Sequence, residues 1–295
     1  MAGSGTTALA TDVSTPYSTG FNVMGTGSLS RGYGQTTFGA TKNVGDTISA
    51  NDFNNIRYDL LNASAHQNGS AAALSLAGNV AGAIINSTDP DAFIPYASTV
   101  DTNRFTCHSS RKSTASAGNN SRTSSWASSV STTYTLNFSS ADQARWFWNG
   151  GGRIRFASSR TGGAASAQNT SWSSLLTSAG TQEFGGAAVY GWGTGSTSLY
   201  SVSSSAPYAS NTYAISVSLN AAMGSATAFN FVLTWSDPYT DPSPGNPPSP
   251  EDIVDGTLSY SVEVTAPTGG HALTPSGTWT GYNYATFSAG AITGG

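Results

Sequence analysis

The strongest constraint on the fold is an alternation of apolar and polar residues, with a period of two, along the second half of the chain. One segment carries Tyr134, Leu136 and Phe138 between threonine and asparagine residues. Five later segments repeat the pattern, at residues 184–190, 199–202, 213–219, 229–235 and 258–264. Successive side chains of a strand point to opposite faces, so the pattern predicts strands with one buried face. Turn residues between the segments indicate an antiparallel β-sandwich over residues 128–266.

An aromatic stretch from Ala144 to Phe156 is predicted to form a β-hairpin in the core of this sandwich. Three consecutive glycines join its two apolar runs, and glycine readily adopts the positive φ angles of a tight loop. A three-residue loop pairs Trp148 with Ile154 and creates one apolar face. The opposite face then carries Arg145, Phe147, Asn149, Arg153 and Arg155. A two-residue loop would pair Phe147 with Ile154, but it separates polar from apolar side chains less well.

Three arginines lie on one face of this hairpin, which is a large share because the whole chain has only 11 Lys and Arg residues. One interpretation is an ordinary solvated face. The other is a docking face for an acidic or aromatic partner, since arginine and aromatic residues are enriched at interfaces. The interface candidates on the hairpin are therefore Arg145, Phe147, Arg153 and Arg155.

The clearest helix is predicted over residues 50–66, in front of the sandwich. Ser49 is a suitable N-cap with Asp52 three residues later, and Gly69 is a typical residue just past a helix. An apolar stripe at helical spacing includes three further interface candidates, which would anchor the chain or bundle it with its copies: Phe53, Ile56 and Leu60. A short second helix is expected within residues 92–104.

The composition changes along the chain predict four regions. They are an extended low-complexity arm over 1–45, a helical and irregular anchoring region over 46–127, the sandwich over 128–266, and a docking tail over 267–295. A proline-dense loop at 237–252 interrupts the sandwich, because proline at this density excludes helices and central strands. Smaller expectations are a loop at 108–127 and one or two helical turns at 170–178.

Charge is scarce: only 9% of residues are charged, compared with about 25% in ordinary globular proteins. This composition fits β-rich secreted or virion proteins with hydroxyl and amide surfaces. It also fits a subunit that buries much of its surface in an assembly, because buried charge is costly. The net charge of −4 argues against a nucleic-acid partner. We expect neither a secretory signal nor membrane insertion, because the required apolar runs are missing from the sequence.

The sequence predicts no catalytic residue, metal site or cofactor. The three histidines are far apart, and no G-x-S-x-G or G-x-G-x-x-G motif occurs. The single cysteine, Cys107, is interpreted as a small buried apolar residue, with an interchain disulfide as the alternative. Carboxylates cluster around the proline-rich loop, where a Ca²⁺ site or a glycosidase pair competes with the solvated acidic loop that we favour: Asp237, Asp241, Glu251, Asp252 and Asp255.

Aromatic residues outside the hairpin suggest a second kind of function. Exposed tryptophan and tyrosine rings stack on sugars, so we consider Trp192, Trp279 and Tyr282 as glycan-stacking candidates. The competing interpretation places these rings in the core or between subunits, where aromatic residues are also enriched.

Several stretches together resemble a group of virion structural proteins of tailed phages. They are Gly32–Gln35 (GYGQ), 48–57 (ISANDFNNIR), 144–160, 169–176 (NTSWSSLL) and 254–258 (VDGTL). Such proteins are common in myoviruses that infect cyanobacteria and are often labelled tail-fibre-like. The resemblance covers residues 32–265. It implies a non-enzymatic, β-rich subunit of a neck or tail appendage.

Three functions follow as hypotheses from these observations. In the first, the chain is a subunit of a trimer or another homo-oligomer and contacts other neck or tail proteins. It is made in the host cytoplasm and located in the virion. In the second, it is a carbohydrate-binding receptor module of the tail that recognises a host-surface glycan. The third, a glycan-depolymerising enzyme, requires paired carboxylates in one groove, and we do not expect it.

Overall fold

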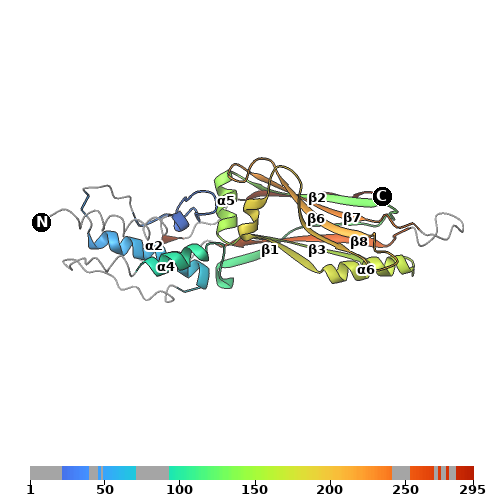
Figure 1. The fold of residues 1–295 in the computed structure, drawn as a ribbon, viewed down its shortest axis with the longest axis horizontal. Coiled ribbons are helices and arrows are strands. Elements are labelled where there is room, and N and C mark those ends of the chain that lie inside the picture. Colours follow the sequence, from blue (N-terminus) through green and yellow to red (C-terminus); the bar gives the residue numbers. More distant parts are fainter. Residues whose placement is uncertain are drawn as a thin grey trace. The chain divides into compact units, whose positions relative to one another are not determined.

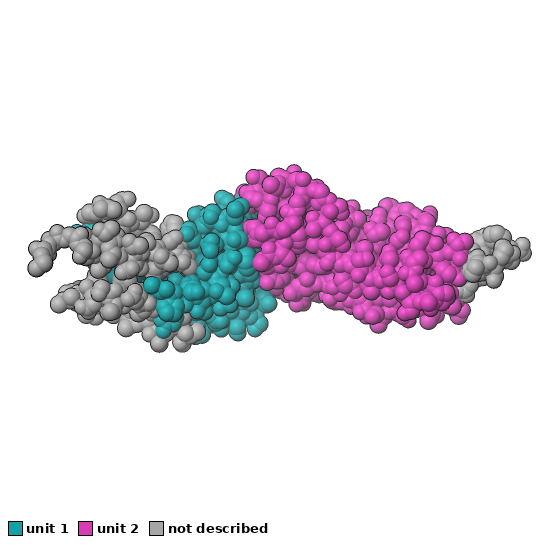
Figure 2. Space-filling model, viewed as in Figure 1, with its two compact units in different colours: residues 1–113, 142–152, 266–283 teal, residues 114–141, 153–265, 284–295 magenta. Residues whose placement is uncertain are grey.

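The computed structural model describes residues 22–39, 46–47, 49–70, 93–240, 253–268, 272–273, 277–278 and 284–295. The chain forms two compact units, which Figure 2 shows in different colours. Unit 1 comprises Met1–Ser113, Asp142–Gly152 and Ala266–Asn283. Unit 2 comprises Thr114–Ala141, Arg153–Thr265 and Tyr284–Gly295. Both units are discontinuous in sequence, so they do not follow the four consecutive regions predicted above.

Unit 2 is built on two antiparallel sheets (Figure 1). The four-stranded sheet has the order β1 (Lys112–Arg122), β8 (Thr257–Pro267), β3 (Arg153–Thr161) and β4 (Thr181–Gly185). The six-stranded sheet has the order β11 (Tyr284–Ala289), β2 (Ser129–Phe138), β7 (Ala228–Ser236), β6 (Thr212–Leu219) and β5 (Thr197–Ser203), and β12 (Thr293–Gly294) also pairs with β2. A separate two-stranded ladder joins β9 (Ala272–Leu273) to β10 (Gly277–Thr278). The predicted mainly β, sandwich-like class is confirmed.

The core of unit 2 lies between the inner faces of these sheets. Phe156 of β3 contacts Tyr134 of β2 and Phe231 of β7, with ring centroids 5.8 and 5.2 Å apart. Tyr260 of β8 reaches Trp235 of β7 at 6.4 Å. All five rings are buried, and each buried side chain of this size contributes roughly 1.5–3 kcal/mol. The period-two pattern therefore identified the sandwich core.

The predicted hairpin at residues 144–156 is wrong in its first half. Residues Ala141–Asn149 form the helix α5, which ends in a turn at Gly150–Gly152 before β3 begins. As a helix, the stretch buries Ala144, Phe147 and Trp148, which lie three and four residues apart on one face. The spacing of the aromatic residues is compatible with either a helix or a strand. The helix forms because its apolar face packs into the interior of the protein. The glycine turn and the second strand were predicted correctly, with Gly151 at φ +94°.

Two smaller predictions also need correction. Residues 108–127, predicted as a loop, contain the edge strand β1, which buries only Ala117 among its apolar residues and therefore carries almost no apolar pattern. The segment 184–190 is only partly a strand: β4 ends at Gly185, and a 3₁₀ helix, η3 (Gly186–Gly191), follows. A short 3₁₀ turn, η2 (Ser109–Arg111), also precedes β1.

The helix α6 (Ala167–Ala179) lies along β3 in unit 2 (Figure 1). Three of its apolar residues are buried, as predicted for residues 170–178: Trp172, Leu175 and Leu176. It begins earlier than predicted because Ser166, rather than Thr170, caps it. The Ser166 hydroxyl accepts a hydrogen bond from the Asn169 backbone N–H at 3.1 Å.

Unit 1 contains the predicted long helix, α2 (Ala50–Asn68), and the shorter α4 (Ile94–Thr102). At the start of α2, the Ser49 backbone N–H donates to the Asp52 carboxylate at 2.8 Å. Gly69 ends the helix at φ +83°, as expected of a residue just past a helix. Among the described residues, no helix is long and apolar enough to cross a membrane.

Candidate functional site

Two of the predicted docking residues are internal to unit 1. The Arg145 guanidinium, only 6% exposed, donates to the backbone carbonyls of Thr26 at 2.7 Å and Arg31 at 2.8 Å. It also pairs with the Asp142 carboxylate at 2.8 Å. Phe147 is fully buried. The prediction that Arg145 and Phe147 face a partner is therefore wrong, because α5 turns both side chains into the unit.

The polar side chains of α5 hold the segment 26–35, which we call the docked loop. Asn149 donates to the carbonyls of Leu29 and Gly32, both at 3.1 Å, and the Trp146 indole donates to Thr26 at 3.0 Å. Gly34 adopts φ +66°, and a Cβ there would lie 2.3 Å from the Trp146 ring. Only glycine fits this position, which explains the second glycine of the GYGQ stretch.

The docked loop presents one apolar side chain to solvent. Leu29 is 61% exposed and has φ +45°, a left-handed conformation that is rare for residues other than glycine. The hydrogen bond from Asn149 to its carbonyl helps to hold it there. A strained backbone that displays a large apolar side chain is a feature of functional surfaces, and nothing in the sequence pattern signals it.

The apolar stripe of α2 serves the chain's own core rather than a partner. Phe53, Ile56 and Leu60 are all buried, and the Phe53 ring packs against Phe93 with centroids 6.2 Å apart. The helical spacing was predicted correctly, but the three residues are not available as interface residues. Burial within unit 1 removes them from that role.

Asp59 of α2 holds the end of the segment 22–39 through hydrogen bonds. The sequence pattern did not single out this carboxylate. Asp59 is 1% exposed and accepts hydrogen bonds from the backbone N–H groups of Phe38 at 2.9 Å and Gly39 at 3.1 Å. Burial raises the pKa of the Asp59 carboxyl to about 6, against the opposing effect of the two hydrogen bonds. In the same unit, burial also raises the pKa of the Tyr33 hydroxyl, which accepts from Gln67 at 2.8 Å.

Cys107 and His66, far apart in sequence, are neighbours in unit 1. The Cys107 Sγ lies 3.9 Å from His66 Nδ1 and 3.2 Å from the Arg111 carbonyl, to which the thiol donates. The other imidazole nitrogen, Nε2, donates to the Gly150 carbonyl at 2.7 Å. Cys107 is half-buried rather than buried as predicted. Across the residues that the structure describes, no group of three or more His, Cys, Asp or Glu side chains is placed to hold a metal ion.

The remaining two hairpin candidates lie on the outward face of the four-stranded sheet. Arg155 pairs with Glu183 of β4 at 2.6 Å and with Glu263 of β8 at 4.0 Å. Arg153 lies 3.9 Å from Glu183. The strand register places Glu183 and Glu263 directly opposite Arg155 on either side. This charged row carries both signs, so it does not form the arginine-rich surface that the sequence suggested.

The glycan-stacking prediction fails for Trp192. Its ring is 5% exposed and packs edge-on against Phe229 and Phe231, at 6.3 and 5.7 Å. It is a core residue of the sandwich and offers no face to a sugar. The other two candidates, Trp279 and Tyr282, lie outside the described residues, as do most of the proline-rich loop and the first 21 residues of the predicted arm.

Asp255 joins two stretches that lie far apart in sequence. Its carboxylate accepts from the side chain of Asn169, from the Ala164 backbone N–H at 3.0 Å, and from Arg160 at 3.3 Å. The Ala164 hydrogen bond, followed by those from Asn169 and Arg160, holds the pKa of the Asp255 carboxyl below its usual range. Desolvation lowers the pKa of Arg160, although Asp255 opposes it. Asp255 therefore fixes the start of α6.

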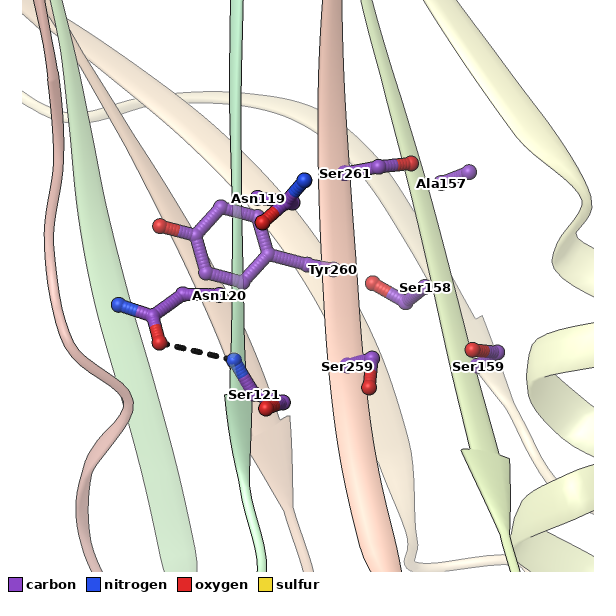
Figure 3. Close-up of a pocket in the computed structure, with 9 residues that line it drawn as sticks. All are labelled: Asn119, Asn120, Ser121, Ala157, Ser158, Ser159, Ser259, Tyr260 and Ser261. Atoms are coloured by element: carbon purple, nitrogen blue, oxygen red, sulfur yellow. Dashed lines mark hydrogen bonds between the residues drawn. The ribbon is translucent and has the colours of Figure 1, made fainter.

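A pocket of about 440 Å³ lies across β1, β8 and β3 of unit 2 (Figure 3). Its lining contains only neutral residues: Asn119, Asn120, Ser121, Ala157, Ser158, Ser159, Ser259, Tyr260 and Ser261. Serine hydroxyls and asparagine amides both donate and accept hydrogen bonds. Neither the period-two pattern nor any motif singled out this site, because serine is abundant along the whole chain.

The fold and these sites define a mainly β protein. Its buried polar and charged side chains mostly stabilise its own loops and strands. Comparison with protein-family models, with curated proteins and with solved structures found no match to this chain.

Proposed function

We propose that the chain is a non-enzymatic structural subunit of a tailed-phage virion, located in a neck or tail appendage and assembled as a homo-oligomer with other neck or tail proteins as neighbours. The observation that carries the proposal is the way in which the phage-like stretches meet. Gly34 packs on Trp146, Asn149 binds the Gly32 carbonyl, and Asp255 binds Asn169. The residues behind the resemblance therefore build a framework, as expected of structural proteins.

Leu29 is the residue that best fits a contact between subunits in unit 1. Its side chain is exposed and apolar, and α5 holds its backbone in place. Hot spots of interfaces are residues that are pre-positioned and become fully desolvated on binding. On this proposal, the left-handed strain at Leu29 is offset by burial of its side chain against a neighbouring subunit.

The substitution Leu29→Asn separates assembly from folding. Asparagine tolerates the left-handed conformation better than leucine, so the isolated chain should unfold at an equal or higher temperature. If Leu29 is an interface residue, the same variant should lose oligomers in light scattering coupled to size exclusion. The matched control is Ile94→Asn, a second exposed apolar residue of unit 1 in ordinary helical conformation.

The virion location is tested on purified tailed particles. Mass spectrometry should find the chain at a stoichiometric copy number, and immunogold labelling should place it at the neck or tail. A chain that is monomeric in solution and missing from the particles would overturn the proposal.

A further inference from the structure

The neutral pocket of unit 2 owes its shape to a floor of small side chains. The register of β3 with β8 pairs Ala157 with Ser261 and Ser159 with Ser259. These four residues share the outward face of the sheet, because the neighbouring Tyr260 points inward and is buried. Larger side chains stand on the same face at one end, where Arg155 and Glu263 follow in the strands.

The third strand supplies one wall of this pocket. Asn119, Asn120 and Ser121 of β1 complete the lining, and the side-chain oxygen Oδ1 of Asn120 accepts from the Ser121 backbone N–H at 2.8 Å (Figure 3). The Asn120 amide nitrogen is also used, because it donates to the Gly290 carbonyl at 3.2 Å. Asn120 is therefore a fixed part of the wall.

Five other polar side chains of the lining keep their hydrogen-bonding capacity. In the part of the chain that the structure describes, no hydrogen bond is made by the side chains of Asn119, Ser121, Ser159, Ser259 and Ser261. The inward-pointing residues of the same strands differ, since Ser158 donates to Tyr213 at 3.1 Å and Tyr260 donates to Gly290 at 2.7 Å. The pocket therefore gathers four hydroxyls and an amide that are available to a ligand.

The chemistry of this lining favours a neutral, hydroxyl-rich ligand. A saccharide hydroxyl donates and accepts, so it can pair with either role of a serine hydroxyl or an asparagine amide. Ionic ligands would meet no charge of opposite sign in the lining, and apolar ligands would leave the hydroxyls unsatisfied. The volume of about 440 Å³ falls within the roughly 300–1,000 Å³ usual for small-molecule sites.

We propose that this pocket binds a neutral saccharide through hydrogen bonds, without an aromatic stacking platform. The proposal does not rest on a virion location. The sugar-binding groups are then the available polar side chains of β1, β3 and β8, and not Trp192, which is buried. Each hydrogen bond exchanged with water adds little, so a single site should bind weakly, and copies in an oligomer would add avidity.

The first experiment applies the full chain to a glycan array that carries neutral, sialylated and sulfated glycans. We expect binding to neutral glycans. A blank array, or binding confined to the acidic glycans, would overturn the proposal.

The second experiment places the binding in this pocket. The double variant Ser259→Val/Ser261→Val keeps good strand residues but removes two hydroxyls of the floor. Titration with the best neutral glycan should show affinity lowered by about tenfold or more, since two hydrogen bonds are lost. The control Ser201→Val/Ser203→Val changes two exposed serines of β5 in the other sheet and should bind as the wild type does. Equal affinity of all three proteins would refute this site, whatever the oligomeric state.

Discussion

Asp59 should make unit 1 less stable as the pH rises from 4 to 6. The pKa of its buried carboxyl is about 6 in the folded chain, compared with an ordinary value of 3.8. The folded state therefore holds a proton more tightly than the unfolded state does, and stability is greater while Asp59 is protonated. The difference between the two pKa values corresponds to about 3 kcal/mol, of which about 2 kcal/mol is lost between pH 4.5 and 7.

The test compares urea unfolding of the wild type and Asp59→Asn at a series of pH values from 4.5 to 7.5. The variant cannot ionise, so its free energy of unfolding should lack this descending component. It keeps one oxygen for the N–H groups of Phe38 and Gly39 and loses the other acceptor, which costs about 1–3 kcal/mol at every pH. The difference between the two proteins should therefore change by about 2 kcal/mol across the range.

Asp101 provides a control of opposite sign. The hydrogen bond from Arg31 lowers the pKa of the Asp101 carboxyl, so its contribution is present at neutral pH and is lost as the pH falls. Asp101→Asn should therefore lose stability mainly at the neutral end.

The titration of Asp59 can also be followed directly. In nuclear magnetic resonance spectra, the amide signals of Phe38 and Gly39 should shift with a midpoint near pH 6. Parallel unfolding profiles for the wild type and Asp59→Asn would refute the reasoning.

Three further substitutions test the packing by thermal or urea unfolding. Gly34→Ala should destabilise the chain by more than 2 kcal/mol, because strain at positive φ adds to a clash with Trp146; Gly162→Ala, at a similar φ but with open space, should cost only about 1 kcal/mol. Arg145→Met should cost about 1–3 kcal/mol, because the Arg31 carbonyl loses its side-chain donor while the Thr26 carbonyl keeps the Trp146 indole, and amide exchange in the docked loop should accelerate. Trp192→Ala should cost about 3–5 kcal/mol without a specific effect on glycan binding, and an unchanged stability would contradict its place in the core.

The sandwich could be predicted from the sequence because each central strand has one buried face. The inward side chains of β6 and β7 alternate without a break over their full lengths. The edge strand β1 was missed because it lacks such a face. It has little apolar surface to bury, and its position is fixed by backbone pairing with β8. Edge strands of this kind leave no periodic signal.

The candidate sites were less predictable because they depend on contacts between distant segments. Asp59 looks like a solvent-facing residue of an amphipathic helix until the chain at residues 38–39 is placed over it. The neutral pocket of unit 2 depends on the register of β3 against β8, which brings small residues from two strands together. Local patterns report burial along one element, and they carry no information about which segments meet.

The stretch from residue 142 to 161 contributes to both units. Residues 142–152 belong to unit 1, where Arg145 and Asn149 bind the docked loop. From Arg153 it belongs to unit 2, where Phe156 enters the sandwich core. A hairpin would have placed both halves in one sheet. The glycine turn instead allows a helix and a strand to follow each other at once, because a Cβ at Gly152 would lie 2.5 Å from the Phe147 ring. Glycine at position 152 is therefore required for the tight turn that separates α5 from β3.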